Sequence, residues 1–104
     1  NTWIGPNVIL DGTAGLEIGD FCSISAGVQI YTHSTVNWSN SMGKAPTEKA
    51  PTKIGNGVYI GPNSIIQMGV TVEDKSAIGA MSFLNKDVKR NQRVFGCPAR
   101  PRGN

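Results

Sequence analysis

Between residues 54 and 88, a large aliphatic residue stands at every sixth position of the chain. These positions are Ile54, Ile60, Ile66, Val72, Ile78 and Leu84. A smaller residue follows four places after each of them, at Val58, Ser64, Val70, Ser76, Ser82 and Val88. Neither a helix, with a period of about 3.6 residues, nor a strand, with a period of about 2, produces this spacing. A repeat of six predicts a short strand and a turn in every step, with the large residues all pointing inward.

The same repeat can be followed back to the start of the chain, with a slip of two residues near position 16. The large residues are Ile4, Leu10, Leu16, Ile18, Ile24 and Ile30, and the smaller ones are Val8, Ala14, Cys22, Val28 and Ser34. Three six-residue steps make one triangular turn, and successive turns stack on one another. We therefore predict an all-β parallel β-helix of about four coils, at residues 1–17, 18–35, 54–71 and 72–89. Its buried residues are expected to include Ile18, Ile24, Ile54, Ile60, Ile66 and Ile78.

Two segments interrupt the repeat. Residues 36–53 have no aliphatic residue at sixth positions and hold two prolines and one glycine, so we expect one external loop. Loops of this length without structure of their own are uncommon in small domains and are usually functional. After residue 88 the spacing breaks again, and residues 90–104 are expected to leave the β-helix as a basic tail.

With 104 residues the chain has room for a single domain, residues 1–104. A domain of this size buries a modest share of its surface, so partner chains are expected. The 16% of charged residues and the 13 glycines suit regular tight turns. No apolar run approaches membrane-spanning length and no charged and then apolar leader is present, which predicts a soluble, cytoplasmic protein without a membrane partner. Because the chain starts at Asn1 within a repeat, we expect a fragment or a processed form.

The two cysteines are expected to remain unpaired. Cys22 occupies one of the smaller interior positions, where a packed and unreactive thiol is the usual outcome. Cys97 lies near the other end of the chain, and coils spaced by about 4.8 Å place the two sulfurs too far apart for a disulfide. This separation agrees with a reducing compartment.

The single histidine, His33, stands where the second coil gives way to the loop. An isolated histidine is more often structural or merely exposed than catalytic. This one lies off the inward-pointing positions and next to the long loop, where coil and loop can share a side chain. Imidazole is well suited to remove a proton from a hydroxyl or an amine at neutral pH. We therefore consider His33 a candidate general base.

The loop supplies further candidates for binding the acceptor. They are Trp38, Met42, Glu48 and Lys49. Glu48 is a candidate to orient the imidazole, as carboxylates do beside catalytic bases. Trp38 can instead pack the loop against a neighbouring chain, with Tyr59 beside it. Asp11, in the first coil, is a further candidate contact of the acceptor.

Six of the ten basic residues fall between positions 86 and 102, where Asp87 is the acidic residue. They are Lys86, Lys89, Arg90, Arg93, Arg100 and Arg102. Such a cluster predicts a site for a polyanion, and a merely solvated surface is the simpler alternative. Nucleic acid would also fit the charge. However, no nucleic-acid motif and no aromatic residues interleaved with the basic ones accompany it, so no nucleic-acid partner is expected.

Four stretches carry a family resemblance: IGDFCSISAGVQIYTH, KIGNGVYIGPNSIIQMGVTV, IGAMSFLNKDV and VFGCPARP. Together they resemble the hexapeptide-repeat acyltransferases, and most closely the galactoside, maltose and polysaccharide O-acetyltransferases. The resemblance covers nearly the whole chain. It implies a left-handed coil, a hand that the spacing alone does not reveal and that the usual preference for right-handed crossovers would not predict.

The resemblance also implies roles for individual residues. His33 matches the base that deprotonates the acceptor for attack on the thioester of acetyl-CoA. The positions that match contacts of coenzyme A are Pro62, Ala80, Asn85, Lys86 and Arg100. Turn backbones would bind the pantetheine amides, and the two cations would bind phosphates. The spacing from Ile30 to His33 is shorter than in the galactoside and maltose enzymes, so the resemblance leaves the acceptor undefined.

The resemblance further implies a homotrimer with active sites between subunits, a small-molecule acceptor, and acetyl-CoA as co-substrate. Transfer to the nitrogen of an amino sugar or another amine is an alternative to transfer to a hydroxyl, and a non-catalytic binding scaffold is a second alternative. A zinc enzyme of the γ-carbonic-anhydrase kind needs three imidazoles. One histidine per chain does not supply them, so no metal is expected.

Overall fold

Each six-residue step of the repeat folds into a two- or three-residue strand followed by a tight turn. The computed structural model describes residues 1–101. Its strands are β1 (Trp3–Ile4), β2 (Ile9–Leu10), β3 (Leu16–Ile18), β4 (Ser23–Ile24), β5 (Gln29–Ile30), β6 (His33–Ser34), β7 (Glu48–Lys49), β8 (Thr52–Ile54), β9 (Tyr59–Ile60), β10 (Ile65–Ile66), β11 (Thr71–Val72), β12 (Ala77–Ile78), β13 (Phe83–Leu84), β14 (Arg93–Gly96) and β15 (Ala99–Pro101). One short helix, α1 (Val36–Asn40), interrupts them.

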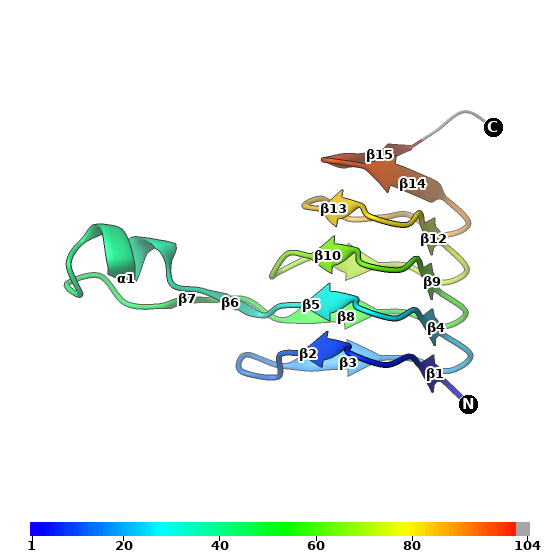
Figure 1. The fold of residues 1–104 in the computed structure, drawn as a ribbon, viewed down its shortest axis with the longest axis horizontal. Coiled ribbons are helices and arrows are strands. Elements are labelled where there is room, and N and C mark those ends of the chain that lie inside the picture. Colours follow the sequence, from blue (N-terminus) through cyan, green and yellow to red (C-terminus); the bar gives the residue numbers. More distant parts are fainter. Residues whose placement is uncertain (102–104) are drawn as a thin grey trace.

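The strands stack into three sheets, one on each side of a triangular coil (Figure 1). Sheet A has the order β1-β4-β9-β12-β14-β15, sheet B the order β13-β10-β5-β2, and sheet C the order β11-β8-β3. All neighbours within the coils pair in parallel, and β14 and β15 pair antiparallel. The predicted parallel β-helix is therefore confirmed.

The interior is a stack of the aliphatic residues that define the repeat. Ile24, Ile60 and Ile78 align in sheet A and are fully buried, as are Ile30 and Ile66 in sheet B. Ile54 is also buried, whereas Ile18, packed against the core from the first coil, is only half-buried. Burying this much apolar surface in register is the main force that holds the coils together.

The external loop differs from the prediction at both ends. The chain leaves the coil earlier, since His33 and Ser34 already form β6, which pairs antiparallel with β7. It also returns earlier, because Thr52 is buried and belongs to β8 in sheet C. We call residues 33–50 the arm. Figure 1 shows it projecting sideways from the coil as a hairpin that carries α1, so it has structure of its own.

A consequence of the early exit is that Thr32 takes the interior position expected for Ser34. Thr32 is completely buried, while Ser34 lies half-buried in the arm. The expectation that the loop starts at residue 36 was wrong because the smaller residue here follows its aliphatic partner, Ile30, by two positions and not by four.

The C-terminal segment does not leave the β-helix as predicted. β14 extends sheet A, with Val94 aligned to Ile78 and almost fully buried, and β15 folds back along it. Val94 follows Ile78 by 16 residues, whereas Ile78 follows Ile60 by 18. The shortened coil hid this rung from a search for sixth positions. Arg102 lies outside the described residues.

Candidate active site

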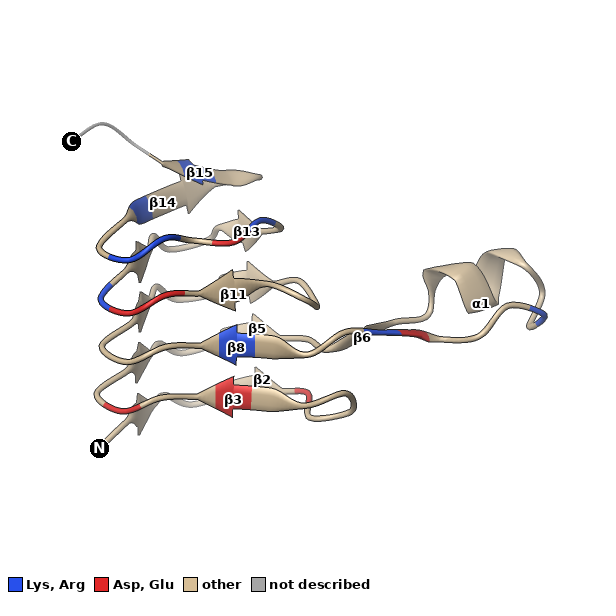
Figure 2. Ribbon diagram, turned by 180° about the vertical axis from the view of Figure 1, so that it is seen from behind, with Lys and Arg blue, Asp and Glu red and all other residues tan. Residues whose placement is uncertain are grey.

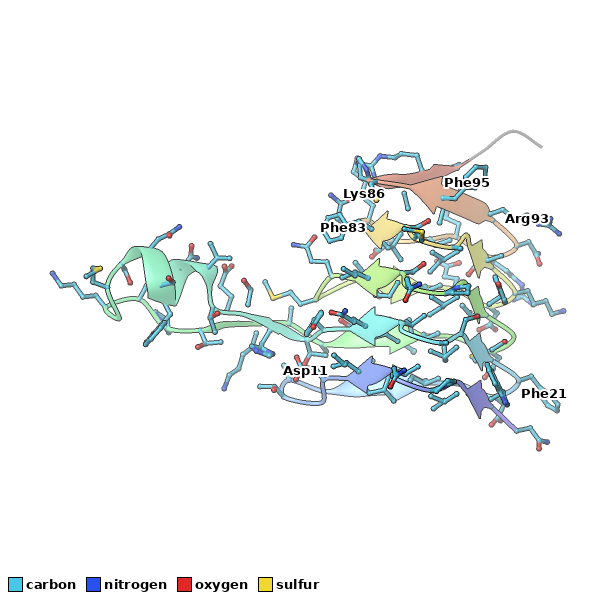
Figure 3. All side chains as sticks on the ribbon, viewed as in Figure 1. Asp11, Phe21, Phe83, Lys86, Arg93 and Phe95 are labelled. Atoms are coloured by element: carbon cyan, nitrogen blue, oxygen red, sulfur yellow. The ribbon has the colours of Figure 1, made fainter. Side chains whose placement is uncertain are left out.

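One edge of the coil, where the strands of sheet B end, brings together residues from all four coils. The residues that follow these strands are Asp11, Tyr31, Gln67 and Asn85. The first three are tied to the next coil, because the backbone N–H groups of Asp11, Tyr31 and Gln67 donate to the carbonyls of Ile30, Ile66 and Leu84 at 2.9, 3.0 and 3.0 Å in turn. The arm leaves from the same edge (Figure 1), and Figure 3 shows Asp11 and Lys86 on it. We call this edge the B–C edge.

His33 opens the arm directly above this edge. Its Nδ1 contacts Oδ2 of Asp11, and 34% of its side chain remains exposed. The Tyr31 ring meets the imidazole edge-on, with centroids 6.4 Å apart. An ionised carboxylate only accepts hydrogen bonds, so Nδ1 donates to Asp11. The lone pair on Nε2 is then free to take a proton from a bound acceptor.

Asp11 is held by an unusually complete set of donors. Oδ1 accepts from the hydroxyl and the N–H of Thr13 at 2.6 and 3.0 Å, and Oδ2 accepts from the N–H of Thr32 at 2.8 Å. The Thr13 hydroxyl and the Thr32 N–H hold the pKa of Asp11 far below its usual range, against the opposing effect of desolvation, and the Thr13 N–H and His33 lower it further. Asp11 is therefore held in its ionised form at neutral pH.

The imidazole meets Asp11 and not Glu48, so the structure corrects the expected orienting group. Glu48 lies in β7 opposite Ser34, and its Oε1 accepts from Nδ2 of Asn37 at 2.9 Å. A strand of alternating side chains explains this, because the residue opposite His33 in the hairpin is Lys49. The proposed acceptor residues Trp38 and Met42 lie further out on the arm, with 51% and 88% of their surface exposed.

The residues proposed to bind coenzyme A divide into two groups. The first group is Asn85, Lys86 and Arg100, and in it Nη1 of Arg100 donates to Oδ1 of Asn85 at 3.0 Å. Arg100 also borders, with Lys86 and Lys89, a hollow of about 270 Å³ at the C-terminal end of the coil. Asn85 follows β13 on the B–C edge, two coils from Tyr31. At about 4.8 Å per coil, that separation is about 10 Å.

The second group lies at the corner between sheets A and B. Pro62 and Ala80 stack there in consecutive coils, and the N–H of Met81 donates to the carbonyl of Pro62 at 2.8 Å. The coils approach so closely that a Cβ at Gly61 would lie 2.5 Å from the backbone nitrogen of Ala80. Glycine is therefore required at position 61, and the exposed Met81 side chain projects from the same corner.

The basic residues near the C-terminus are more dispersed than a single cluster (Figure 2). Arg90 lines a separate hollow with Lys53 and Glu73, and Arg93 begins β14 at the opposite edge of the coil from Lys86 (Figure 3). Three of the six predicted cations border the hollow near Asn85: Lys86, Lys89 and Arg100. Asp87 lines the same hollow, so three cations and one carboxylate border it.

Two residues of the site were missed by the sequence analysis, Thr13 and Thr32. The Asp-x-Thr spacing at residues 11–13 is a signal for the first, because aspartate often bonds the backbone two residues on. Elsewhere, Cys22 is buried as expected and Cys97 is exposed, and both thiols are free. Within residues 1–101 we find no group of three side chains suited to a metal ion and no helix able to span a membrane.

Fold and site together define a class: a β-helix of hexapeptide coils that carries a histidine–aspartate pair at the base of an inserted arm. The protein-family model "Bacterial transferase hexapeptide (six repeats)" matches residues 51–86, and a second family model, "Hexapeptide repeat of succinyl-transferase", matches residues 1–32. The chain belongs to the hexapeptide-repeat family of acyltransferases. Its coil is the left-handed parallel β-helix that the resemblance implies.

Several relatives are enzymes that act on sugars by name. Galactoside O-acetyltransferase of Escherichia coli is 46% identical over 120 residues, which span 96% of this chain and 59% of that protein. A maltose O-acetyltransferase structure from Clostridium difficile has a TM-score of 0.78 at 32% identity and covers 96% of this chain and 57% of that one. A Vibrio cholerae hexapeptide-repeat acetyltransferase complexed with acetyl-CoA has a TM-score of 0.84 at 36% identity, with 96% and 55% covered. The chain thus spans little more than half the length of these relatives.

Proposed function

We propose that this chain forms the catalytic β-helix of an acetyltransferase that moves the acetyl group of acetyl-CoA to a hydroxyl, most suitably of a sugar. The observation that carries the proposal is the contact between His33 and Asp11 at the B–C edge, about two coils from Asn85 and Lys86. The names of the galactoside and maltose enzymes support the acceptor class. The acetyl-CoA complex of the Vibrio relative supports the donor.

In this proposal His33 acts as general base. Nε2 takes the proton of the acceptor hydroxyl while its oxygen attacks the thioester carbonyl. The tetrahedral intermediate expels the thiolate of coenzyme A, which recovers the proton from the imidazolium. The C–S bond breaks, the C–O bond forms, and the enzyme is not acylated. Asp11 stays ionised throughout and stabilises the imidazolium, as its five contacts and lowered pKa favour.

The donor would lie along the coil from the B–C edge to its C-terminal end. Lys86 and Arg100 would bind phosphates, and Asn85, already bonded to Arg100, would fix the guanidinium. The turns at Pro62 and Ala80 lie at the other corner of sheet B, away from this path, and we give them no part in it. The hollow beside Lys86, Lys89 and Arg100 is consistent with a polyanionic end group.

We further propose that three chains associate with the active sites between them. None of the five residues of α1 is buried, and Val36, Trp38 and Met42 expose 57%, 51% and 88% of their surface. A five-residue helix on a two-residue hairpin is not stable by packing of its own. A neighbouring copy that covers the arm would supply the missing contacts and place Trp38 beside the acceptor.

The proposal is tested by replacing the base. In the protein that contains this chain, His33→Ala is expected to lower kcat by roughly 10²- to 10⁴-fold with little change in acetyl-CoA binding. Release of coenzyme A is measured with galactosides, maltose, amino sugars and chloramphenicol as acceptors, and the product shows whether oxygen or nitrogen is acetylated. Activity within a few-fold of the parent protein would remove His33 from this role.

The donor site has a test of a different kind. Lys86→Ala and Arg100→Ala are expected to raise the KM for acetyl-CoA more than they lower kcat, because contacts far from the reacting carbon bind ground and transition states alike. Lys44→Ala, a change on the exposed arm, serves as the control for loss of one positive charge. Equal losses in kcat and KM would contradict this placement of the phosphates.

A further inference from the structure

The carboxylate of Asp11 receives more donors than an orienting group needs. Beside the imidazole, the two hydroxyls of Thr13 and Thr32 and the two backbone N–H groups of the same residues surround it. A carboxylate offers about four lone-pair positions, and the imidazole, the Thr13 hydroxyl and the two N–H groups fill them. The single proton of the Thr32 hydroxyl is shared between the Asp11 carbonyl and Oδ2. The carboxylate is therefore held in one orientation, with Oδ1 toward Thr13 and Oδ2 toward Thr32 and the imidazole.

Thr32 reaches this position through the early exit of the arm. It is completely buried between the first and second coils, and its hydroxyl lies 3.0 Å from the Asp11 carbonyl and 3.1 Å from Oδ2. The same hydroxyl accepts from the N–H of Ala14 at 3.0 Å. Thr32 thus joins the turn that carries Asp11 to the strand end that carries His33.

Thr13 holds the opposite side of the carboxylate and differs from Thr32 in exposure. It lies in the exposed turn after Asp11, and its hydroxyl makes the short 2.6 Å bond to Oδ1. Its N–H bonds the same oxygen, so replacing the hydroxyl removes one donor while the turn keeps the other. An effect of Thr13 on the imidazole must therefore pass through Asp11.

We propose that Thr13 and Thr32 are positioning residues that hold the carboxylate of Asp11 with Oδ2 turned toward the imidazole, and thereby fix His33 with its proton on Nδ1 and its lone pair on Nε2. The catalytic meaning of this lock rests on the proposed function, in which Nε2 takes the acceptor proton. The lock itself is a property of the resting protein. A base with the proton on the wrong nitrogen has the right geometry and no lone pair to offer, as in serine proteases whose orienting aspartate is amidated.

The other charged and polar groups near the imidazole do not duplicate this function. Lys49 lies opposite His33 in the arm hairpin, and Glu48, opposite Ser34, bonds Asn37. Tyr31 meets the ring by its edge, and its hydroxyl donates to Oε1 of Gln29 at 2.6 Å. Asp11 is left as the group that contacts Nδ1.

His33 is the only histidine in the chain, so its two ring nitrogens can be followed by ¹⁵N NMR without ambiguity. At a pH where the ring is neutral, the parent protein is expected to carry the proton on Nδ1. Thr13→Val should shift part of the population to the Nε2-protonated form, and Thr13→Ser should restore the parent spectrum. Thr71→Val, an exposed threonine on sheet C, is the matched control. Identical tautomer populations in the parent, Thr13→Val and Thr13→Ser proteins would overturn the proposal.

Kinetics add a readout that a purely structural role would not move. Thr13→Val should lower kcat by about tenfold, a part of what a positioned base supplies, while the KM for acetyl-CoA and the melting temperature stay unchanged. A rise in KM together with an unchanged tautomer would assign Thr13 to the structure alone and reject the lock. Thr32→Val and Thr32→Ser repeat the test on the buried side of the carboxylate. If a Thr32 variant does not fold, the exposed Thr13 variants still decide the proposal. Absence of acetyl transfer from the parent protein would reject the proposed function, while the NMR result still decides the lock.

Discussion

Asp11 and His33 lie 22 positions apart and meet because they stand in neighbouring coils. The first coil carries two extra residues in the turn after Asp11, and the second coil sends its chain outward at the same height. This offset places a carboxylate from one coil beside an imidazole from the next. The contact is therefore created by stacking and cannot be read from local spacing.

The ionised state of Asp11 gives a prediction for stability in acid. Its pKa in the folded protein is lowered, so its contribution is fully present above the unfolded value of about 3.9 and is lost as the pH falls below it. Asp11→Asn should lower the melting temperature at pH 7 and flatten its decline between about pH 5 and pH 3. The measurement is calorimetry across this range, with Glu17→Gln on the outer face of sheet C as the control. Parallel declines in the parent and Asp11→Asn proteins would contradict the prediction.

At this scale the sequence identified the participants but not their pairing. His33 and Asp11 were both expected near the acceptor, and Glu48 was expected on the imidazole. Side chains in a hairpin alternate, and a one-residue change of register moves each to the other face. The register of β6 on β7, with Lys49 opposite His33, is set by the buried exit at Thr32. Sequence spacing carries no direct signal for that register.

At the scale of elements, the period of six was sufficient to predict the sheets and most of the core. It failed where a coil is shorter or longer than 18 residues. Val94 comes two residues early in sheet A, and Thr52 follows the arm in sheet C, yet both are buried inside the coil. The strands are only two to four residues long, so no strand has a pattern of its own that would identify it without the repeat.

The stacked interior predicts a sharp contrast between neighbouring residues of β9. Ile60 is completely buried between Ile24 and Ile78, whereas Tyr59 points outward and is 44% exposed. Ile60→Asp forces an unpaired charge into an apolar stack and should abolish the cooperative thermal transition. Tyr59→Asp is the control and should keep that transition. Circular dichroism decides between them, and a native melting temperature for Ile60→Asp would mean that the register is wrong.

At the scale of the whole molecule, the arm gives the chain its longest dimension. The extents are 44 × 29 × 21 Å, and the longest runs along the arm and across the stack of coils (Figure 1). The outward-facing residues of sheet B are apolar apart from Gln29, and Ile9 and Ile65 expose 47% and 36% of their surface. An apolar sheet face and an uncovered arm on one chain favour association between copies.

If the active sites lie between chains, two defective proteins can complement each other. A His33→Ala chain and a chain with both Lys86→Ala and Arg100→Ala are unfolded together, refolded as a mixture and assayed for acetyl transfer. Some mixed interfaces then receive both intact halves, and activity should return to a fraction of the parent value. Each variant refolded alone is the control. Sedimentation of the parent as a monomer, or confirmed mixed trimers without recovered activity, would contradict shared sites.

The base of the arm is closed, so changes in the sequence of the arm need not alter the coil that carries it. Thr32 and Ala50 meet there through a backbone hydrogen bond of 3.0 Å, so the coil continues as if nothing had been inserted. Lengthening a loop whose ends are already joined costs little, about 0.6 kcal/mol for each doubling. Residues between Ser34 and Lys49 can therefore be exchanged without disturbing the contact of His33 with Asp11, and under the proposed function such an exchange would alter which acceptor is recognised.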